Sequence, residues 1–315
     1  MHKTPIIFDT DPGIDDAAAI SILLTNPAFD VKLMTSVAGN VTVDKTTTNI
    51  LKLAHFFNRQ DIKVARGAEK PLVKKFEDAS HIHGESGMPG YDFGEVQTTI
   101  LDLSAVDAMV EVLQSSLEKV TVVAVGAFTN IANLITQHPE VLSKIERLVV
   151  MGGSLSGGNM TSVAEFNVFT DPDAAKIVFN SGLDITMIGL DVTLKALISG
   201  DTVAKLQGAN ETGRMLTAMM AFYGDNEETG KPMHDVNTLY YLLHPESYQL
   251  VDYWVDVVTD GPAIGGTVAD IRHAYHDKHN VHVALGVDRP AFEQWFIAAI
   301  GQISDEQINM GKVEI

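Results

Sequence analysis

The sequence contains no cysteine, and this absence excludes disulfide bonds, thiolate zinc sites and a cysteine nucleophile. Positive charge is also scarce, because 22 lysine and arginine residues face 41 aspartate and glutamate residues, which gives a net charge of −19. Such a chain has little basic surface with which to neutralise phosphate groups. Neither a nucleic acid nor an anionic membrane is therefore an expected partner.

Long apolar runs are missing as well. The first apolar run, at residues 5–8, is too short for a secretory leader, and no run approaches the roughly 18–20 residues of a membrane helix. We therefore expect a soluble, cytoplasmic protein. The 315 residues include 45% hydrophobic and 20% charged residues, which is typical of a globular chain with a large core.

Short β-branched runs alternate with helical patterns along the chain. The expected strands are residues 5–8, 31–37, 62–65, 120–125, 147–151, 185–188, 253–259 and 280–285. The expected helices are residues 15–25, 46–57, 129–136, 214–223, 236–243 and 290–300, with one more that opens at 171–173. Thr129 and Asp171 are expected to cap their helices. This alternation predicts βαβ units, an open parallel sheet and one continuous domain over residues 1–315.

Four carboxylates stand within eight residues of one another near the start of the chain. The segment D-T-D-P-G-I-D-D at 9–16 follows an expected strand and leads into an expected helix, so it lies at the sheet edge where α/β proteins bind ligands. Like charges packed this closely raise one another's pKa, and a divalent cation relieves the repulsion. Because all the donors are hard oxygens, Ca²⁺ or Mg²⁺ suits them better than Zn²⁺. The alternative is a solvated loop with an over-capped helix.

Irregular segments carry the other polar candidates, at residues 71–99, 152–167 and 224–235. Long loops in a compact α/β protein are usually functional or disordered. His81 and His83, in the first segment, either touch a substrate or are simply exposed. The second segment contains Asn159, Glu165 and Asn167, groups that grip sugar hydroxyls, although asparagine in a glycine-rich loop is also a common turn residue.

The third segment ends in Met233-His234-Asp235, directly before an expected apolar helix. Asp235 is either the N-cap of that helix or a distant metal ligand with His234 beside it as an acid–base group. Other well-known catalytic motifs are absent from the sequence, which has no G-x-x-x-x-G-K-[ST], no H-E-x-x-H and no G-x-S-x-G.

A series of sequence blocks completes the pattern. The blocks are F-D-T-D-P-G-I-D-D-A at 8–17, V-A-G-N at 37–40, H-G-E-S-G-M at 83–88, G-A-F-T-N-I-A at 126–132, V-M-G-G at 150–153, A-E-F-N at 164–167, G-L-D-V-T at 189–193 and M-H-D at 233–235. With these blocks, in this order over nearly the whole chain, the protein resembles the ribonucleoside hydrolases of the inosine–uridine-preferring family. It is most similar to the broad-specificity bacterial members, which take purine and pyrimidine ribosides.

The resemblance implies a single domain with a Rossmann-like, mostly parallel sheet flanked by helices, a bound Ca²⁺ and a homotetramer or homodimer. The implied Ca²⁺ ligands are the side chains of Asp11, Asp16 and Asp235 and the main-chain carbonyl of Val125. Asp11 is also the implied general base, acting on a Ca²⁺-bound water, and His234 the implied acid near the leaving base. The implied substrate-binding residues are Asp15, Asn40, His83, Met151, Asn159, Glu165 and Asn167. Asp9 is expected behind the ligands rather than among them.

The expected reaction is hydrolysis of the N-glycosidic bond of purine and pyrimidine ribonucleosides to free base and ribose. Two alternatives stay open at this point. One is a phosphatase of the haloacid-dehalogenase-like kind, with Asp9 or Asp11 as nucleophile, and the other is a non-catalytic nucleoside-binding protein. The acidic segment 222–231, with Phe222 and Tyr223, is expected to close over the ligand as a lid.

Overall fold

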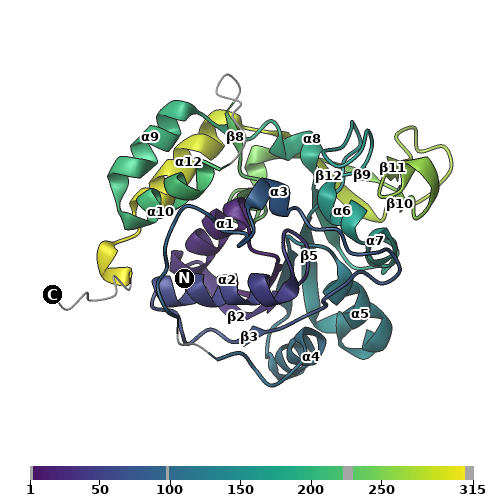
Figure 1. Cartoon of the computed structure of the whole chain (residues 1–315). Helices are drawn as coiled ribbons and strands as arrows, with labels where there is room; N and C mark the ends of the chain where they lie inside the picture. Colours follow the sequence, from purple (N-terminus) through teal and green to yellow (C-terminus); the bar gives the residue numbers. More distant parts are fainter. Residues whose placement is uncertain (1–2, 97–98, 223–229, 309–315) are drawn as a thin grey trace.

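The strand β1 (Thr4–Thr10) lies inside a sheet, and its central side chains, Ile6, Ile7 and Phe8, are apolar on both faces. Ile6 and Phe8 pack into one buried cluster and Ile7 into another, so the strand contacts two separate cores. A strand covered on both faces is typical of a parallel sheet between helices. The computed structural model in Figure 1 describes residues 3–96, 99–222 and 230–308.

The central sheet is built from segments along almost the whole chain. In spatial order its strands are β3 (Val64–Ala65), β2 (Phe29–Ser36), β1, β4 (Val120–Ala124), β5 (Ile145–Met151), β6 (Ile185–Ile188), β12 (Val281–Val287) and β9 (Tyr248–Tyr253). Neighbours pair in parallel, except that β9 pairs with β12 antiparallel at one edge. Two short ribbons, outside this sheet, are β10 (Val255–Val257) with β11 (Thr267–Ala269) and β7 (Leu197–Ile198) with β8 (Lys231–Pro232).

Helices flank the sheet on both faces. The α-helices are α1 (Ile14–Thr25), α2 (Val43–Phe56), α3 (Ser80–His83), α4 (Ala105–Ser115), α5 (Thr129–Gln137), α6 (Phe166–Thr170), α7 (Pro172–Phe179), α8 (Leu190–Thr193), α9 (Gly200–Ala209), α10 (Glu211–Met220), α11 (Val236–Leu243) and α12 (Arg289–Gly301). Short 3₁₀ helices are at Pro139–Lys144, Pro245–Ser247, Gly261–Ala263 and Asp305–Gln307.

The two faces carry different sets of helices. The core that contains Phe8 receives side chains from α1, α2, α10, α11 and α12, and the core that contains Ile7 receives them from α4, α5 and α7. Figure 1 shows α9, α10 and α12 side by side beyond one end of the sheet. The expected α/β class, with a mostly parallel sheet flanked by helices, is therefore confirmed.

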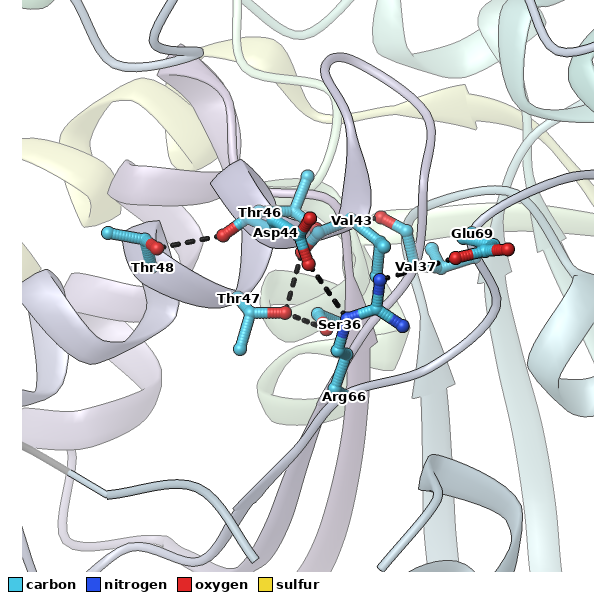
Figure 2. Close-up of polar contacts among 9 residues, drawn as sticks. All are labelled: Ser36, Val37, Val43, Asp44, Thr46, Thr47, Thr48, Arg66 and Glu69. Atoms are coloured by element: carbon cyan, nitrogen blue, oxygen red, sulfur yellow. Dashed lines mark hydrogen bonds and ion pairs between the residues drawn. The ribbon is translucent and has the colours of Figure 1, made fainter.

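The turn between β2 and α2 is fixed by short polar contacts, which Figure 2 shows. Thr46 Oγ1 donates to the carbonyl of Val37 at 2.9 Å, and Thr47 Oγ1 lies 2.6 Å from Ser36 Oγ. On the exposed side, Arg66 Nε donates to Asp44 at 2.8 Å. These contacts hold the first turn of α2 against the end of β2, and so they fix the ends of residues 37–42, the loop that carries the V-A-G-N block.

Some expectations for individual elements were wrong. Thr129 does not cap α5, because its hydroxyl donates instead to Asp171 at 2.7 Å and Phe128 occupies the cap position without a side-chain bond. The expected strand at 253–259 is split, since its first residue ends β9 and only Val255–Val257 forms β10. Asp171 does cap α7 through Ala174 N, as predicted. Among the described residues we find no helix with the length and apolar character that a membrane crossing demands.

Candidate active site

The predicted site residues gather at the carboxyl edge of the parallel strands. The residues that end or follow β1, β2, β4 and β5 at this edge are Asp11, Asp15, Asp16, Asn40, Val125 and Met151. This is the position at which open α/β sheets bind ligands. The loop after β1 therefore lies where the sequence predicts it.

Four buried carboxylates converge there. Asp11 comes from the loop between β1 and α1, Asp15 and Asp16 from the first turn of α1, and Asp235 from the residue before α11. All four are 1–4% exposed. Carboxylate oxygens of Asp15, Asp16 and Asp235 lie within 4.8 Å of one another. Asp235 holds the N-cap position of α11 but makes no side-chain capping bond. The carboxylate of Asp235 is thus directed to the cluster rather than to its own helix.

Burial and mutual repulsion disfavour the charged forms of these acids. Burial, the charge of Asp16 and that of Asp15 hold the pKa of Asp11 well above its usual range. The pKa of Asp235 is raised for the same reasons, burial first, and burial followed by the charge of Asp15 raises the pKa of Asp16 to about 6. A cation in contact with the cluster would offset this cost.

The backbone and neighbouring side chains hold two of the acids in place. Asp16 accepts hydrogen bonds from Thr10 Oγ1 at 2.5 Å and from the backbone N–H of Gly13 at 2.9 Å. Asp11 Oδ2 accepts from the backbone N–H of Asn40 at 2.7 Å, and Asn40 Nδ2 donates to the Asp11 carbonyl at 3.0 Å. Gly39 is needed for this approach, since a Cβ there would lie 1.9 Å from Asp11 Oδ2.

One wall of the site is built around Glu165. Its carboxylate, 2% exposed, accepts from the backbone N–H groups of Gly153 at 2.8 Å, Asn167 at 2.9 Å and Val168 at 3.2 Å. These bonds favour the charged form, yet burial outweighs them and raises the pKa of Glu165 to about 7. Glu165 is therefore fixed in orientation by the start of α6, which it caps.

Amide side chains complete that wall. Asn167 Nδ2 donates to the carbonyl of Val125 at 2.8 Å and to that of Met151 at 3.0 Å. Asn159 Oδ1 accepts from the backbone N–H of Phe166 at 2.9 Å. Asn167 therefore orients the Val125 carbonyl, which keeps a second lone pair for another partner.

Two histidines approach from separate segments. His83, in α3, is buried, and its Nδ1 accepts from the backbone N–H of Ile14 at 3.2 Å, which leaves the ring proton on Nε2. Nδ1 of His234 lies 2.7 Å from Thr193 Oγ1 at the end of α8. Burial lowers the pKa of both rings. His81 of the same helix α3 is exposed, in agreement with the simpler of its two interpretations.

These groups line one pocket. It encloses about 600 Å³ including its open mouth. The predicted residues that line it are Asp15, Asn40, His83, Val125, Met151, Asn159, Glu165, Asn167, His234 and Asp235. Asp11 and Asp16 lie beneath this surface, in contact with Asn40. The pocket thus has carboxylates on one side, amides and Glu165 on another, and two imidazoles.

The donor set fits a hard divalent cation. Two oxygens on opposite sides of a Ca²⁺ ion are at most about 5 Å apart, and the oxygens of the three grouped aspartates meet this limit. The structure groups Asp15 with Asp16 and Asp235, whereas the family resemblance implies Asp11 in that set. Asp11 lies near them, because Asn40 donates hydrogen bonds to both Asp11 and Asp16.

Asp9 lies behind the cluster, within β1. Its Oδ1 accepts from Thr35 Oγ1 at 2.5 Å and from Asn130 Nδ2 at 2.7 Å, while Oδ2 has no hydrogen-bond partner among the described residues. Burial raises the pKa of Asp9 to about 7. Asp9 is absent from the residues that line the pocket.

Several pocket residues were not anticipated from the sequence. Ala79, Ile82, Met160 and Phe166 line the pocket, and Thr193 contacts His234. Thr193 ends the block G-L-D-V-T just after β6. Its place at the carboxyl edge could have indicated that it lies near the pocket. The apolar residues carry no such signal, because their role depends on loop geometry.

The expected lid at 222–231 is described only at its two ends. Phe222 is 55% exposed and Gly230 precedes β8, whereas residues 223–229, including Tyr223, lie outside the described residues.

Comparisons with known proteins find relatives that match nearly the whole chain. The sequence profile of the family described as inosine-uridine preferring nucleoside hydrolase matches residues 6–294. The non-specific ribonucleoside hydrolase RihC of Klebsiella pneumoniae is 48% identical over 295 residues, which cover 93% of this chain and 97% of the relative. The protein of the same name from Salmonella paratyphi B is 48% identical over 292 residues, covering 92% and 95%.

Solved structures show the same architecture. The purine-preferring ribonucleoside hydrolase from Gardnerella vaginalis superposes with a TM-score of 0.88 at 30% identity and covers 95% of this chain and 98% of its own. A plant nucleoside hydrolase superposes with a TM-score of 0.89 at 29% identity, covering 95% and 99%.

Proposed function

The chain belongs to the inosine-uridine preferring nucleoside hydrolase family, and from this premise we propose which substrates it cleaves and how. It is an enzyme that hydrolyses the N-glycosidic bond of ribonucleosides. We propose that it accepts both purine and pyrimidine ribonucleosides, because the relatives at 48% identity are named non-specific. Family membership removes the phosphatase alternative.

One observation carries the proposal. The buried carboxylates of Asp15 and Asp235 line the same pocket as a fixed Glu165 and two asparagine side chains, Asn159 and Asn167. A ribose presents hydroxyl groups on its ring and on C5′, and carboxylate and amide oxygens are the natural acceptors for them. The two imidazoles then lie where a heterocyclic base would extend from the sugar.

A Ca²⁺ ion is part of this proposal. Asp11, Asp16, Asp235 and the Val125 carbonyl would hold it, with Asp15 next to them. When bound, the ion would neutralise the carboxylates, lower the pKa of a water molecule and chelate the 2′- and 3′-hydroxyl groups.

The chain's own residues would carry the proton transfers. In the reaction the water oxygen bonds to C1′ while the bond from C1′ to the base nitrogen breaks, and the bonding electron pair leaves with the base. Asp11 takes the water proton, since Asn40 holds one of its oxygens by a 2.7 Å bond and so fixes the carboxylate. His234 gives a proton or a hydrogen bond to the departing base.

The remaining polar residues position the sugar. Asp15 and Asn40 bind hydroxyl groups of the sugar beside the acidic cluster. Glu165, Asn159 and Asn167 bind hydroxyl groups at the wall built around Glu165. Met151 packs near the ribose ring. Negative charge around the ring stabilises the oxocarbenium character that develops at C1′. His83, whose Nδ1 accepts from the backbone N–H of Ile14, contacts the base.

The test is a release assay on inosine, uridine, cytidine, adenosine, xanthosine and 2′-deoxyuridine, with free base and ribose measured by chromatography. We expect release from the ribosides and poor release from the deoxyriboside, which lacks the 2′-hydroxyl. Asp11→Ala should lower kcat by about 10²–10⁴-fold, the usual contribution of a general base. Asp201→Asn, an exposed acid in α9, is the matched control and should behave as wild type.

Two results would contradict the proposal. If the wild-type protein binds nucleosides tightly and releases no base over hours, the chain is a binding protein that has kept the pocket. If Asp11→Ala turns over at nearly the wild-type rate, the hydrolase activity stands but Asp11 is not its base.

A further inference from the structure

We propose a second metal site, for a nitrogen-preferring divalent ion such as Zn²⁺, at the amino ends of the parallel strands β6 and β12. The active site lies at the carboxyl ends of the strands. The ligands of the second site are Asp252 on β9, His282 on β12 and His279 in the turn that precedes β12. One donor atom from each of these residues lies within 4.8 Å of the other two. None of the three is part of the nucleoside pocket.

The fold itself places the ligands. β9 and β12 are antiparallel neighbours, and His282 stands directly opposite Asp252 in their register, so both side chains point to the same face. Nδ1 of His282 lies 2.5 Å from Asp252 Oδ1, and Nδ1 of His279 lies 3.8 Å from Asp252 Oδ2. The side chains of Asp252 and His279 are exposed, so ions from solvent can reach them.

A second carboxylate supports the site from behind. Nε2 of His282 lies 3.1 Å from Asp184, the residue just before β6. A histidine that ligates a metal through one nitrogen commonly donates its other N–H to a carboxylate, which fixes the tautomer and the ring orientation. Asp184 holds His282 in this way and turns Nδ1 towards Asp252 and His279.

The arrangement suits an ion better than it suits ion pairs alone. The two oxygens of Asp252 face different rings, and the rings of His279 and His282 are 5.1 Å apart. One divalent ion placed among these donors would bond to all three residues, whereas separate pairs use Asp252 for one ring at a time. Zn–N and Zn–O bonds are about 2.0–2.2 Å long, so the 2.5 Å contact must open by under 1 Å. The side chains of Asp252 and His279 are 51% and 48% exposed, so they can move by this distance.

The ligand chemistry separates the two metal sites. Imidazole nitrogens favour Zn²⁺ and its neighbours in the transition series, whereas the all-oxygen cluster of the active site favours Ca²⁺. Zn²⁺ should therefore bind at the Asp252 site even when Ca²⁺ saturates the nucleoside pocket. By joining the segment before β12 to the edge strand β9, the ion would stabilise that edge.

Isothermal titration of the untagged protein with ZnCl₂, in millimolar CaCl₂, tests the proposal. Wild type should bind one equivalent with micromolar affinity, and His279→Asn should weaken binding at least tenfold. His282→Ala should do the same. His138→Asn is the matched control and should bind as wild type does. His138 pairs with Glu140 at 3.1 Å on the surface, and no described residue adds a third donor to this pair.

Thermal unfolding gives a second readout. Zn²⁺ should raise the Tm of wild type and of His138→Asn and should leave that of His279→Asn unchanged, because only a bound ion adds stability. The rate of uridine hydrolysis in CaCl₂ verifies that each variant is folded. Absence of Zn²⁺ binding by wild type, or equal binding by His279→Asn and wild type, would overturn the proposal without touching the proposed hydrolase activity.

Discussion

At the scale of single residues, the contact between Thr193 and His234 has the clearest consequence for the reaction. The distance from Thr193 Oγ1 to His234 Nδ1 is 2.7 Å, and Thr193 is fully buried. If the hydroxyl donates to Nδ1, the ring proton is on Nε2, where it can reach a departing base. Thr193 is thus a positioning residue for His234.

Thr193→Val removes the hydroxyl and keeps the shape of the side chain. We expect kcat to fall by about tenfold or more with KM nearly unchanged, because orientation of a general acid matters in the transition state more than in the ground state. Thr193→Ser should restore most of kcat. Steady-state kinetics with inosine measure both values, and a rise in KM alone would assign Thr193 to substrate binding instead.

The sequence predicts site residues well where chemistry is local to a motif. Asp15, Asp16, Asn40 and Asp235 all line or underlie the pocket, as expected. It says less about residues that act through another side chain. Thr193 was part of a matched block without a role, because no local pattern tells which histidine a threonine will meet.

At the scale of elements, Asp171 joins parts of the fold that are distant in sequence. Its carboxylate caps α7 through Ala174 N at 3.0 Å and accepts from Thr129 Oγ1 of α5 at 2.7 Å. It also accepts from the backbone N–H of Leu72 at 2.9 Å, in the loop that leads to His83. One buried side chain therefore connects two helices and a loop that enters the active site.

Asp171→Ala should lower the free energy of unfolding by about 3 kcal/mol, the sum of a lost cap and of buried donors left without partners. Urea denaturation measures this loss. Asp173→Ala, two residues along in the same first turn, is the matched control and should cost less than about 1 kcal/mol. Similar losses for the two variants would show that the links to Leu72 and Thr129 add little.

The sequence predicts elements well where hydrophobic periodicity is strong. The strands of the parallel sheet are within a few residues of their expected positions, because their apolar runs are nearly continuous. β9 was missed except for its last residue, Tyr253, since an edge strand carries exposed polar residues such as Gln249 and Asp252. The prediction that Thr129 caps α5 was wrong, because Asp171, 42 residues away, accepts a hydrogen bond from its hydroxyl.

At the scale of the whole molecule, the proposed calcium site should couple metal binding to stability. The carboxylates of Asp11, Asp15, Asp16 and Asp235 are nearly inaccessible to solvent. Without a cation their repulsion and desolvation oppose folding, and an ion that binds only the folded state adds stability by mass action. At a free Ca²⁺ concentration a hundred times its dissociation constant the gain is about 2.7 kcal/mol.

Asp235→Asn should therefore have opposite effects on stability in the absence and in the presence of Ca²⁺. In excess chelator, removing one of four crowded charges should raise the Tm above that of wild type. In CaCl₂, wild type should gain several degrees over its own chelated form and Asp235→Asn little or nothing, because a ligand has been lost. Differential scanning calorimetry with and without chelator measures all four values, with Asp201→Asn as the control that should follow wild type in both buffers. A Ca²⁺-induced rise of equal size in Asp235→Asn and wild type would mean that the ion binds elsewhere, and the acidic cluster would then need another explanation for its burial.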